Sequence, residues 1–509
     1  MNNLPALTHL VTNHPADPAL LDRLREPRTD VVRERAAGAD RFEAELGPFR
    51  HYVRQLEVAG DGAITEIIDF ELAVPFWWVL FALPMRWTLK RPGRPNRRPW
   101  WAPPEVLDDR ASTVLGLLCS IALVDGYVGS MLTQTITYAA ADFGEDRQAQ
   151  GTTLAAVRAG VLLALVLAAR ADRIGRRRLV ATSAAGACIA AAAGALAPNL
   201  VWLGATQLLA TGCVGALGLL IAIVSAEEMP AGARAYGFSL VTMAASLGAG
   251  MCVWVLPAAD IGSDGWRLVF VVPLLGLAVA VAVGRRLPET RRFARPHIDA
   301  PLAGHGARLG LLAVAGFLGA LFVAPAFQFQ NDYLRSERGF SAARIALFTV
   351  VTSTPAAIGV VAGGRWADVH GRKKIGAIGV VGGTLAAVLM FATSGWSLWV
   401  IAIAGSIVGA LVIPALGVYR PELFPTGLRG RAGGIIEAVT LAGSATGLLL
   451  VGTLVDRWDG YARPIALVAL GPLIVAVLVL TKFPETAGRE LEELNPEDEI
   501  VGPDSFSTQ

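Results

Sequence analysis

The stretch Asp172-Arg173-Ile174-Gly175-Arg176-Arg177-Arg178 places a dense charge cluster between two long apolar segments. A similar stretch, Asp368-Val369-His370-Gly371-Arg372-Lys373-Lys374, lies 196 residues downstream and has the same position relative to its own apolar neighbours. A motif that recurs once at such a distance suggests an internal repeat.

Two further pairs of motifs repeat in nearly the same register. Glu227 stands seven residues before Arg234, and Glu422 stands seven before Arg429, at an offset of 195 residues. Pro288-Glu289-Thr290 recurs as Pro484-Glu485-Thr486 at an offset of 196. Three matching pairs predict that the membrane part of the chain was built by duplicating one half.

The composition favours a membrane protein. Of the 509 residues, 54% are hydrophobic and 17% charged, and the mean hydropathy is +0.51. A soluble fold of this size cannot usually bury so much apolar surface, so a lipid bilayer is the expected partner. The formal net charge of +2 provides no global basic field for nucleic acid. The four cysteines lie inside apolar segments without the spacing of a zinc site or a disulfide framework, so neither metal nor cofactor is expected.

Apolar segments recur along the chain after residue 110, and each approaches the roughly 20 residues that a membrane span needs. Gly and Ala are abundant in them, which permits close helix packing in lipid. We therefore predict an all-α membrane protein with twelve transmembrane helices in two pseudo-symmetric six-helix bundles. The segments lie near 112–138, 148–169, 179–197, 200–223, 236–256, 267–284, 309–328, 342–363, 375–393, 397–418, 431–453 and 462–480.

The charge of the connections predicts the orientation. Arg and Lys concentrate after the even-numbered segments, whereas the connections after the odd-numbered segments are short and mostly neutral or acidic. By the positive-inside rule both termini are expected in the cytoplasm, with the protein in the cytoplasmic (inner) membrane. The expected parts are an N-terminal extension (1–110), a first bundle (111–285), a central cytoplasmic loop (286–308), a second bundle (309–482) and a cytoplasmic tail (483–509). The acidic run 492–499 of the tail is expected to be solvated.

The N-terminal extension holds two patterns. Residues 49–58 and 63–72, joined by Ala59-Gly60-Asp61-Gly62, predict a β-hairpin. The aromatic run 76–87 is too short to cross a bilayer and precedes a basic segment. That composition favours an interfacial segment lying in the headgroup layer of an anionic leaflet. The alternatives are that the aromatic side chains cover the hairpin as the core of a soluble domain, or that a thirteenth span exists. The basic segment and its aromatic neighbours are Lys90, Arg91, Arg94, Arg97, Arg98, Trp100 and Trp101.

Taken together, residues 110 to 495 resemble the major facilitator superfamily of secondary transporters. The loop around Asp172 is similar to the signature of that superfamily, with Ala168 where a Gly is expected, while the downstream copy keeps Gly364. The Glu and Arg pairs and the Pro-Glu-Thr motifs are similar to the sugar-porter branch and its metabolite-symporter relatives. The resemblance implies alternating access of one cavity between two bundles.

The repeated charges form the candidate cytoplasmic gate. Carboxylates near helix N-termini are stabilised by the helix dipole, and Arg and Glu side chains can pair across helix ends. Such a network would form when the cytoplasmic side is shut and break when it opens. The alternative is that these charges only determine topology. The gate candidates are Asp172, Arg173, Arg176, Glu227, Arg234, Glu289, Asp368, Arg372, Glu422, Arg429, Glu437 and Glu485.

Two charged residues inside the apolar segments are candidates for binding solute and protons. Asp125 lies in the first segment and Arg158 in the second, at depths expected to differ by a few Å, and buried charges are costly in lipid. As a pair they could bind an anion and exchange a proton. The alternatives are a purely structural pair, or an Arg158 that reaches outward to the membrane surface. Asp125-Gly126-Tyr127 also resembles the first-helix pattern of aromatic-acid symporters, although Val128 replaces their second Asp.

Three amides complete the candidate site. Gln207 stands in the fourth segment where many members of the superfamily carry an Arg. Gln328 and Gln330 end the seventh segment within Phe327-Gln328-Phe329-Gln330, and such amide and aromatic groups suit a polar organic ligand. The paired-glutamine pattern of sugar porters is missing, which disfavours hexose.

These patterns predict a secondary active transporter that moves a small organic solute by alternating access, with proton-coupled uptake. The alternatives are a proton-antiport exporter of drugs or metabolites, and a membrane-bound sensor that uses the long N-terminal extension. The sequence has no nucleophile–base pair, metal cluster or phosphate loop, so an enzyme is not expected. The expected partners are the solute, protons and lipid, and a monomer is expected.

Overall fold

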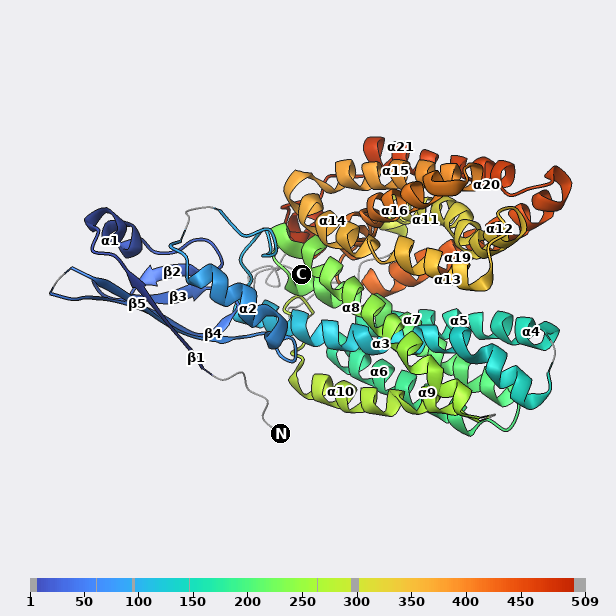
Figure 1. The fold of residues 1–509 in the computed structure, drawn as a ribbon, viewed down its shortest axis with the longest axis horizontal. Helices are drawn as coiled ribbons and strands as arrows, with labels where there is room; N and C mark the ends of the chain where they lie inside the picture. The colour runs from blue at the N-terminus through green and yellow to red at the C-terminus, as the bar shows by residue number, and fades with distance from the viewer. Residues whose placement is uncertain are drawn as a thin grey trace, which may run out of the picture.

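The computed structural model describes residues 7–60, 62–93, 97–145, 147–262, 264–293 and 302–498. Two helical halves lie side by side, and a small β-sheet domain stands beyond one end of their helices (Figure 1). We call this end of the helices, which holds Gly175, residues 229–233 and Gly371, the charged end, and the opposite one the far end.

The N-terminal domain is a five-stranded antiparallel sheet with the order β1-β5-β4-β3-β2. The predicted hairpin is confirmed, because β4 pairs with β5 from Val58↔Ile64 to Phe49↔Leu72. The other three strands were not predicted from the sequence. Alternate residues of β5 are buried, as expected for a sheet with one covered face. The elements are β1 (Thr8–His14), α1 (Pro18–Arg25), β2 (Arg33–Ala36), β3 (Arg41–Leu46), β4 (Phe49–Val58), β5 (Ile64–Leu72) and α2 (Trp78–Leu89).

Helix α2 combines two of the alternatives for the aromatic run. Met85 and Leu89 are buried in the core of the sheet domain. On the outer side of the helix Leu80 and Leu83 are exposed, and Trp87 is 62% exposed. The segment is therefore part of a domain core on one side and an exposed apolar surface on the other. At 12 residues it is too short for a span.

Twelve helices in the described part of the chain are long and apolar enough to cross a membrane, as predicted. Those of the first half are built from α3 (Asp109–Phe143), α4 (Arg147–Arg158), α5 (Gly160–Ile174), α6 (Arg176–Ala193), α7 (Leu200–Glu228), α8 (Arg234–Val255), α9 (Arg267–Val271) and α10 (Pro273–Arg286). Those of the second half are built from α11 (Gly306–Gln328), α12 (Gln330–Ser336), α13 (Ala342–Ser353), α14 (Ala356–His370), α15 (Arg372–Ala392), α16 (Gly395–Ala410), α17 (Val412–Gly417), α18 (Tyr419–Glu422), α19 (Arg429–Trp458), α20 (Ala462–Val468) and α21 (Leu470–Thr481). A short helix, α22 (Leu491–Leu494), follows.

Glycines set the closest helix contacts inside each half. A Cβ added at Gly248 of α8 would lie 1.9 Å from the carbonyl oxygen of Leu123 in α3. A Cβ added at Gly447 of α19 would lie 2.1 Å from the carbonyl oxygen of Leu321 in α11. The same kind of backbone contact therefore occurs in both halves, where the lack of a side chain lets two helices approach in lipid.

The two halves meet along α8 with α14 and along α5 with α19. A Cβ added at Gly364 of α14 would lie 2.7 Å from the carbonyl oxygen of Ala235 in α8. A Cβ added at Gly434 of α19 would lie 2.8 Å from a methyl carbon of Leu165 in α5. These contacts lie toward the charged end of the helices, which brings the repeated charges of the two halves together there.

Candidate functional site

Two equivalent tight turns begin the site at the charged end. Gly175 joins α5 to α6 with φ +105°, and Gly371 joins α14 to α15 with φ +97°, values that favour glycine. The backbone N–H of Arg176 donates to Glu289 Oε1 at 2.8 Å, and that of Arg372 donates to Glu485 Oε1 at 2.9 Å. Each glutamate thus caps the N-terminus of the helix after the turn, where the helix dipole favours a carboxylate.

A reciprocal pair of buried glutamates links the halves. Glu227 of the first half lies 3.4 Å from Arg176 of its own half and 2.7 Å from Arg429 of the second half. Glu422 of the second half contacts Arg372 of its own half and lies 3.6 Å from Arg234 of the first half. All six side chains are essentially buried. Charges buried this deeply are tolerated when they are paired, so separating the halves requires another partner or water for each of them.

Asp368 adds a third contact between the halves. Its carboxylate accepts hydrogen bonds from the backbone N–H groups of Ala235 at 3.2 Å and Tyr236 at 2.8 Å, at the N-terminus of α8. It also lies 3.2 Å from Arg372. The side chain of Asp172, its counterpart in the first half, lies outside the described part of the structure. We call Glu227, Glu422, Asp368 and their arginine partners the latch.

Two further gate candidates, Arg173 and Glu437, do not join the two halves through any described contact. Arg173 is exposed and has no hydrogen bond or ion pair to a described residue. Glu437 lies 2.5 Å from Arg420, but this pair belongs to the second half alone and both side chains are partly exposed.

The C-terminal segment extends the latch, which corrects the expectation that its acidic run is only solvated. Asp498 lies 3.0 Å from Arg429 and accepts from the backbone N–H of Thr426 at 2.9 Å. Glu490 lies 3.2 Å from both Arg234 and Arg292, and Glu492 lies 3.1 Å from Arg292. The signal in the sequence was the surplus of arginine at the same face, which required acidic partners from elsewhere in the chain.

Inside the membrane part, Asp125 is the notable polar residue. Its Oδ1 atom is buried and has no hydrogen-bond partner in the described part of the chain. The neighbouring helix α7 presents Gly218, where an added Cβ would lie 4.0 Å from Asp125 Oδ2. A buried polar group without a partner is costly, and such residues in membrane helices mark ion and substrate pathways.

The structure does not pair Asp125 with Arg158, and it corrects their expected depths. The depths of the two residues can be compared along helix α7, because Gly218 lies beside Asp125 and Gly215 lies beside Ala164 of α5. Arg158 is six residues farther toward the far end than Ala164. At ~1.5 Å per residue, Arg158 is therefore about 13 Å farther out than Asp125. It is exposed, and among the described residues it has no ion pair.

Arg158 nevertheless lies on the side of its helix that faces the second half. Leu165, two turns along the nearly continuous helix, contacts Gly434 of α19, and residues seven apart lie on one side of an α-helix. The exposed guanidinium therefore stands on the surface between the halves, on the far-end side of their contact.

The three amides have different environments. Gln207 is 2% exposed, and its amide lies 3.4 Å from the carbonyl oxygen of Ala191 within the first half. In this structure it fills a contact between helices of the first half. Gln328 is exposed and Gln330 is partly exposed at the far-end side of α11 and α12, where both remain candidates for solute contacts.

Comparison with known proteins adds a family. The model of the Major Facilitator Superfamily matches residues 118–330 and 309–503. Among solved structures, the proton:xylose symporter XylE bound to 6-bromo-6-deoxy-D-glucose superposes with a TM-score of 0.65 at 16% identity, covering 77% of this chain and 99% of that one.

Three curated relatives are transporters or resistance proteins. The niacin transporter NiaP of Acinetobacter baylyi is 25% identical over 366 residues, covering 64% of this chain and 82% of the relative. The gallate transporter of Pseudomonas putida is 25% identical over 415 residues, covering 72% and 90%. The puromycin resistance protein pur8 of Streptomyces alboniger is 37% identical over 130 residues, which cover 24% of this chain and only 26% of that protein.

Proposed function

Since the chain belongs to the Major Facilitator Superfamily and is a multi-pass membrane transporter, we propose that it imports a small organic anion together with protons by alternating access. The observation that carries this proposal is the reciprocal latch. Glu227 and Glu422 each form an ion pair with an arginine of the other half, so specific ion pairs hold the charged end closed. Opening that end breaks them, which makes the two halves a two-state element.

Asp125 is the proposed proton carrier. It is half-buried beside a helix that presents glycine, and one buried carboxylate oxygen has no hydrogen-bond partner in the described part of the chain. A carboxylate in such surroundings is costly when ionised and inexpensive when neutral, so exchange of its proton responds to water reaching it from one side or the other.

The proposed solute is an aromatic carboxylate. Arg158 stands exposed on the face between the halves, and an arginine binds a carboxylate through two parallel hydrogen bonds. Niacin and gallate, the compounds in the names of two relatives, are both aromatic acids. We expect Arg158→Gln to raise the KM for the transported acid by about tenfold or more, since a hydrogen bond to a charged group contributes about 1.5–3 kcal/mol. An unchanged KM would remove Arg158 from the solute site.

The test of proton coupling uses the purified protein in liposomes, with radiolabelled niacin and gallate as first probes. We expect accumulation when the outside is made acidic. Asp125→Asn should abolish this pH-driven accumulation while keeping solute exchange at equal pH, because the exchange needs no net proton movement. Asp456→Asn, a change to an exposed acid near the end of α19, is the matched control. If Asp125→Asn accumulates solute with an unchanged pH profile, the proton role of Asp125 is wrong.

Export is a second candidate, favoured by the match to the puromycin resistance protein. An exporter would load its solute at the charged end and exchange it for protons from the far end. Cells that lack the protein would then become sensitive to puromycin-like compounds, and the liposomes above would take up no acid from the side of the far end.

A further inference from the structure

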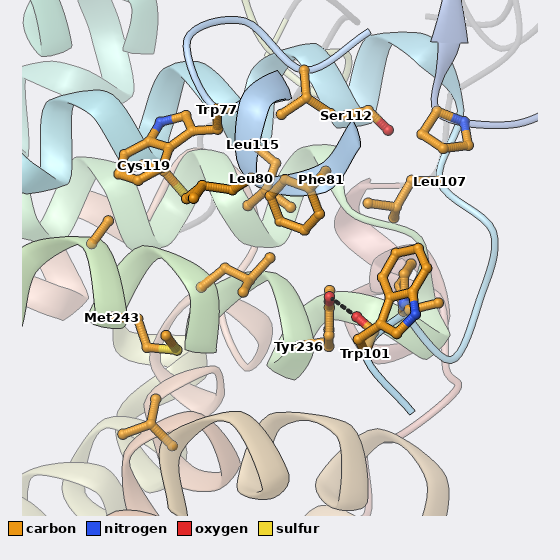
Figure 2. A pocket seen from close by; sticks show the side chains of 18 of the residues that line it. Trp77, Leu80, Phe81, Trp101, Leu107, Ser112, Leu115, Cys119, Tyr236 and Met243 are labelled. Carbon is orange, nitrogen blue, oxygen red and sulfur yellow. Dashed lines mark hydrogen bonds between the residues drawn. The ribbon is translucent and has the colours of Figure 1, made fainter. Parts of the chain in front are cut away.

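An apolar groove of about 810 Å³ lies between the N-terminal domain and both halves. Trp77, Leu80 and Phe81 form one wall, from α2 and the residue before it, and Figure 2 shows them facing Leu115 and Cys119 of α3 and Met243 of α8. The remaining wall belongs to the second half, with Ala357 and Val360 of α14 and Ile413 of α17. The volume falls within the roughly 300–1,000 Å³ of small-molecule sites.

The groove is continuous with the exposed apolar side of α2. Leu80 both lines the groove and is exposed, and Trp87 at the end of the same helix is 62% exposed. Trp100, on the connection that leads from α2 to the groove, is also exposed. Tryptophans at the edge of an apolar surface are typical of a headgroup layer, so the open side of the groove faces lipid.

One polar group in the groove lacks a partner. Ser112 of α3 is 2% exposed, and its hydroxyl has no hydrogen-bond partner in the described part of the chain. It lines the groove (Figure 2). A buried hydroxyl without a partner is costly, which points to an oxygen acceptor or donor supplied by an occupant.

Three arginines that do not line the groove lie near its charged-end rim. Arg365 of α14 donates to the carbonyl oxygen of Ala102, which lines the groove. Burial lowers the pKa of Arg98, the negative charge of Glu105 raises it, and the positive charges of Arg33 and Arg365 nearby lower it. None of the three has an ion pair with a described residue.

Two carboxylates lie near this rim, and one of them is in an ion pair. Glu105 accepts from the backbone N–H of Gly232 at 2.7 Å. Asp30 pairs with Arg28 at 3.0 Å. Arg98, Arg33 and Arg365 outnumber Glu105, so the rim carries excess positive charge beside an apolar groove, the combination that suits an anionic headgroup with an acyl chain.

We propose that this groove binds one anionic phospholipid from the leaflet at the charged end, with an acyl chain between α2, α8 and α14 and the phosphate at Arg98, Arg365 and Arg33. Bilayer and groove are equally apolar, so the acyl chain alone would give no selectivity and the arginines must select the lipid. Because the walls come from both halves and the N-terminal domain, the lipid holds the latched arrangement together.

The link between the halves supports this role. The hydroxyl of Tyr236 in α8 donates to the carbonyl oxygen of Trp101 at 2.7 Å (Figure 2), and Arg365 of the other half bonds the next carbonyl, of Ala102. Residues 101–102 thus connect the two halves directly beside the proposed headgroup. A lipid at this place is favoured in the latched state and released when α8 and α14 separate.

The experiment measures lipid binding to the full-length protein by native mass spectrometry and by thermal stability in detergent. The probes are phosphatidylglycerol and phosphatidylcholine with identical acyl chains. We expect one phosphatidylglycerol to be retained per chain and to raise the Tm more than phosphatidylcholine does. Arg98→Gln should weaken its binding about five-fold, the effect of one arginine near an anionic lipid surface. Arg91→Gln, at an exposed arginine that does not line the groove, should not.

A second set of variants tests the acyl chain. Ala357→Trp places an indole ring in the groove from the α14 side. Met243→Trp does the same from the α8 side and is used if the first variant fails to fold. Either should abolish the retained lipid. Equal effects of the two lipids, or unchanged selectivity in Arg98→Gln, would overturn the proposal. So would a full Tm shift from glycerol 3-phosphate alone, because the ligand would then be a soluble anion. None of these measurements depends on transport.

Discussion

At the residue scale, the latch depends on two buried glutamates whose partners come from both halves. Glu227 accepts from Arg429 and also from the hydroxyl of Thr290 at 2.5 Å. Removing one member of a buried ion pair leaves the other uncompensated, at a cost of about 3–5 kcal/mol. A surface pair contributes only about 0–1 kcal/mol. The location of an ion pair therefore decides whether it can bias the two conformations.

The first prediction at this scale concerns Glu227→Gln. Without the carboxylate, the ion pair between the halves at Arg429 is lost and Asp498 of the C-terminal segment remains as the ionic partner of that arginine, so we expect the charged end to open. Spin labels at the exposed positions Arg178 and Lys374 should report a longer distance between the halves. Glu437→Gln, in the partly exposed pair with Arg420, is the control and should leave the distance distribution unchanged. An identical distribution in Glu227→Gln would show that the latch does not hold the halves together.

At the element scale, helix approach depends on glycines at particular positions. In α8, Gly248 faces the backbone of α3, while a Cβ added at Gly250 would meet no atom within 4 Å. These two glycines of the same helix thus differ in the space that is available for a side chain. The first must remain without a side chain, and the second need not.

This contrast gives a matched test in one helix. Gly248→Ala forces α3 and α8 apart, and overpacking of this kind costs about 1–3 kcal/mol. We expect a lower Tm of the purified protein and a loss of transport. Gly250→Ala should be neutral or slightly stabilising, by about 0.4–1 kcal/mol, because alanine restricts the unfolded chain. A lower Tm for Gly250→Ala alone would contradict the packing described for α8.

At the scale of the whole molecule, the N-terminal domain is attached to the transporter through its own last residues and α2. The indole N–H of Trp77 donates to Ser120 of α3 at 2.9 Å, and Thr113 donates to the carbonyl oxygen of Ala73. The sheet itself is held together by a buried ion network in which Arg54 lies 2.7 Å from Glu34. The domain thus has a core of its own and contacts the first half along α3.

Deletion of residues 1–100 separates transport from a sensor role. We expect the shortened protein to retain uptake, because Asp125, Arg158 and the latch lie outside the deleted part. Its Tm should be lower and no longer depend on phosphatidylglycerol, because α2 forms one wall of the groove. Uptake into liposomes is measured in parallel for the shortened and the full-length protein. A full-length protein that binds its solute but moves little of it would favour the membrane-bound sensor instead.

The sequence by itself determined the repeat, the twelve spans and which residues carry charge at the helix ends. These are local properties, since hydropathy over about 20 residues decides whether a helix suits a bilayer. The motifs of the two halves also indicated that Glu227, Glu422, Arg234 and Arg429 would lie at one face.

Only the tertiary structure decided which of these charges meet. Glu227 reaches Arg429 of the other half, and Asp498 joins them. Arg158 lies about 13 Å from the level of Asp125. These positions depend on the depth and rotation of neighbouring helices. Depth and rotation follow from close backbone contacts such as that of Gly248 with Leu123. A hydropathy pattern carries no information on those contacts, because every apolar side of a helix is equally suited to lipid.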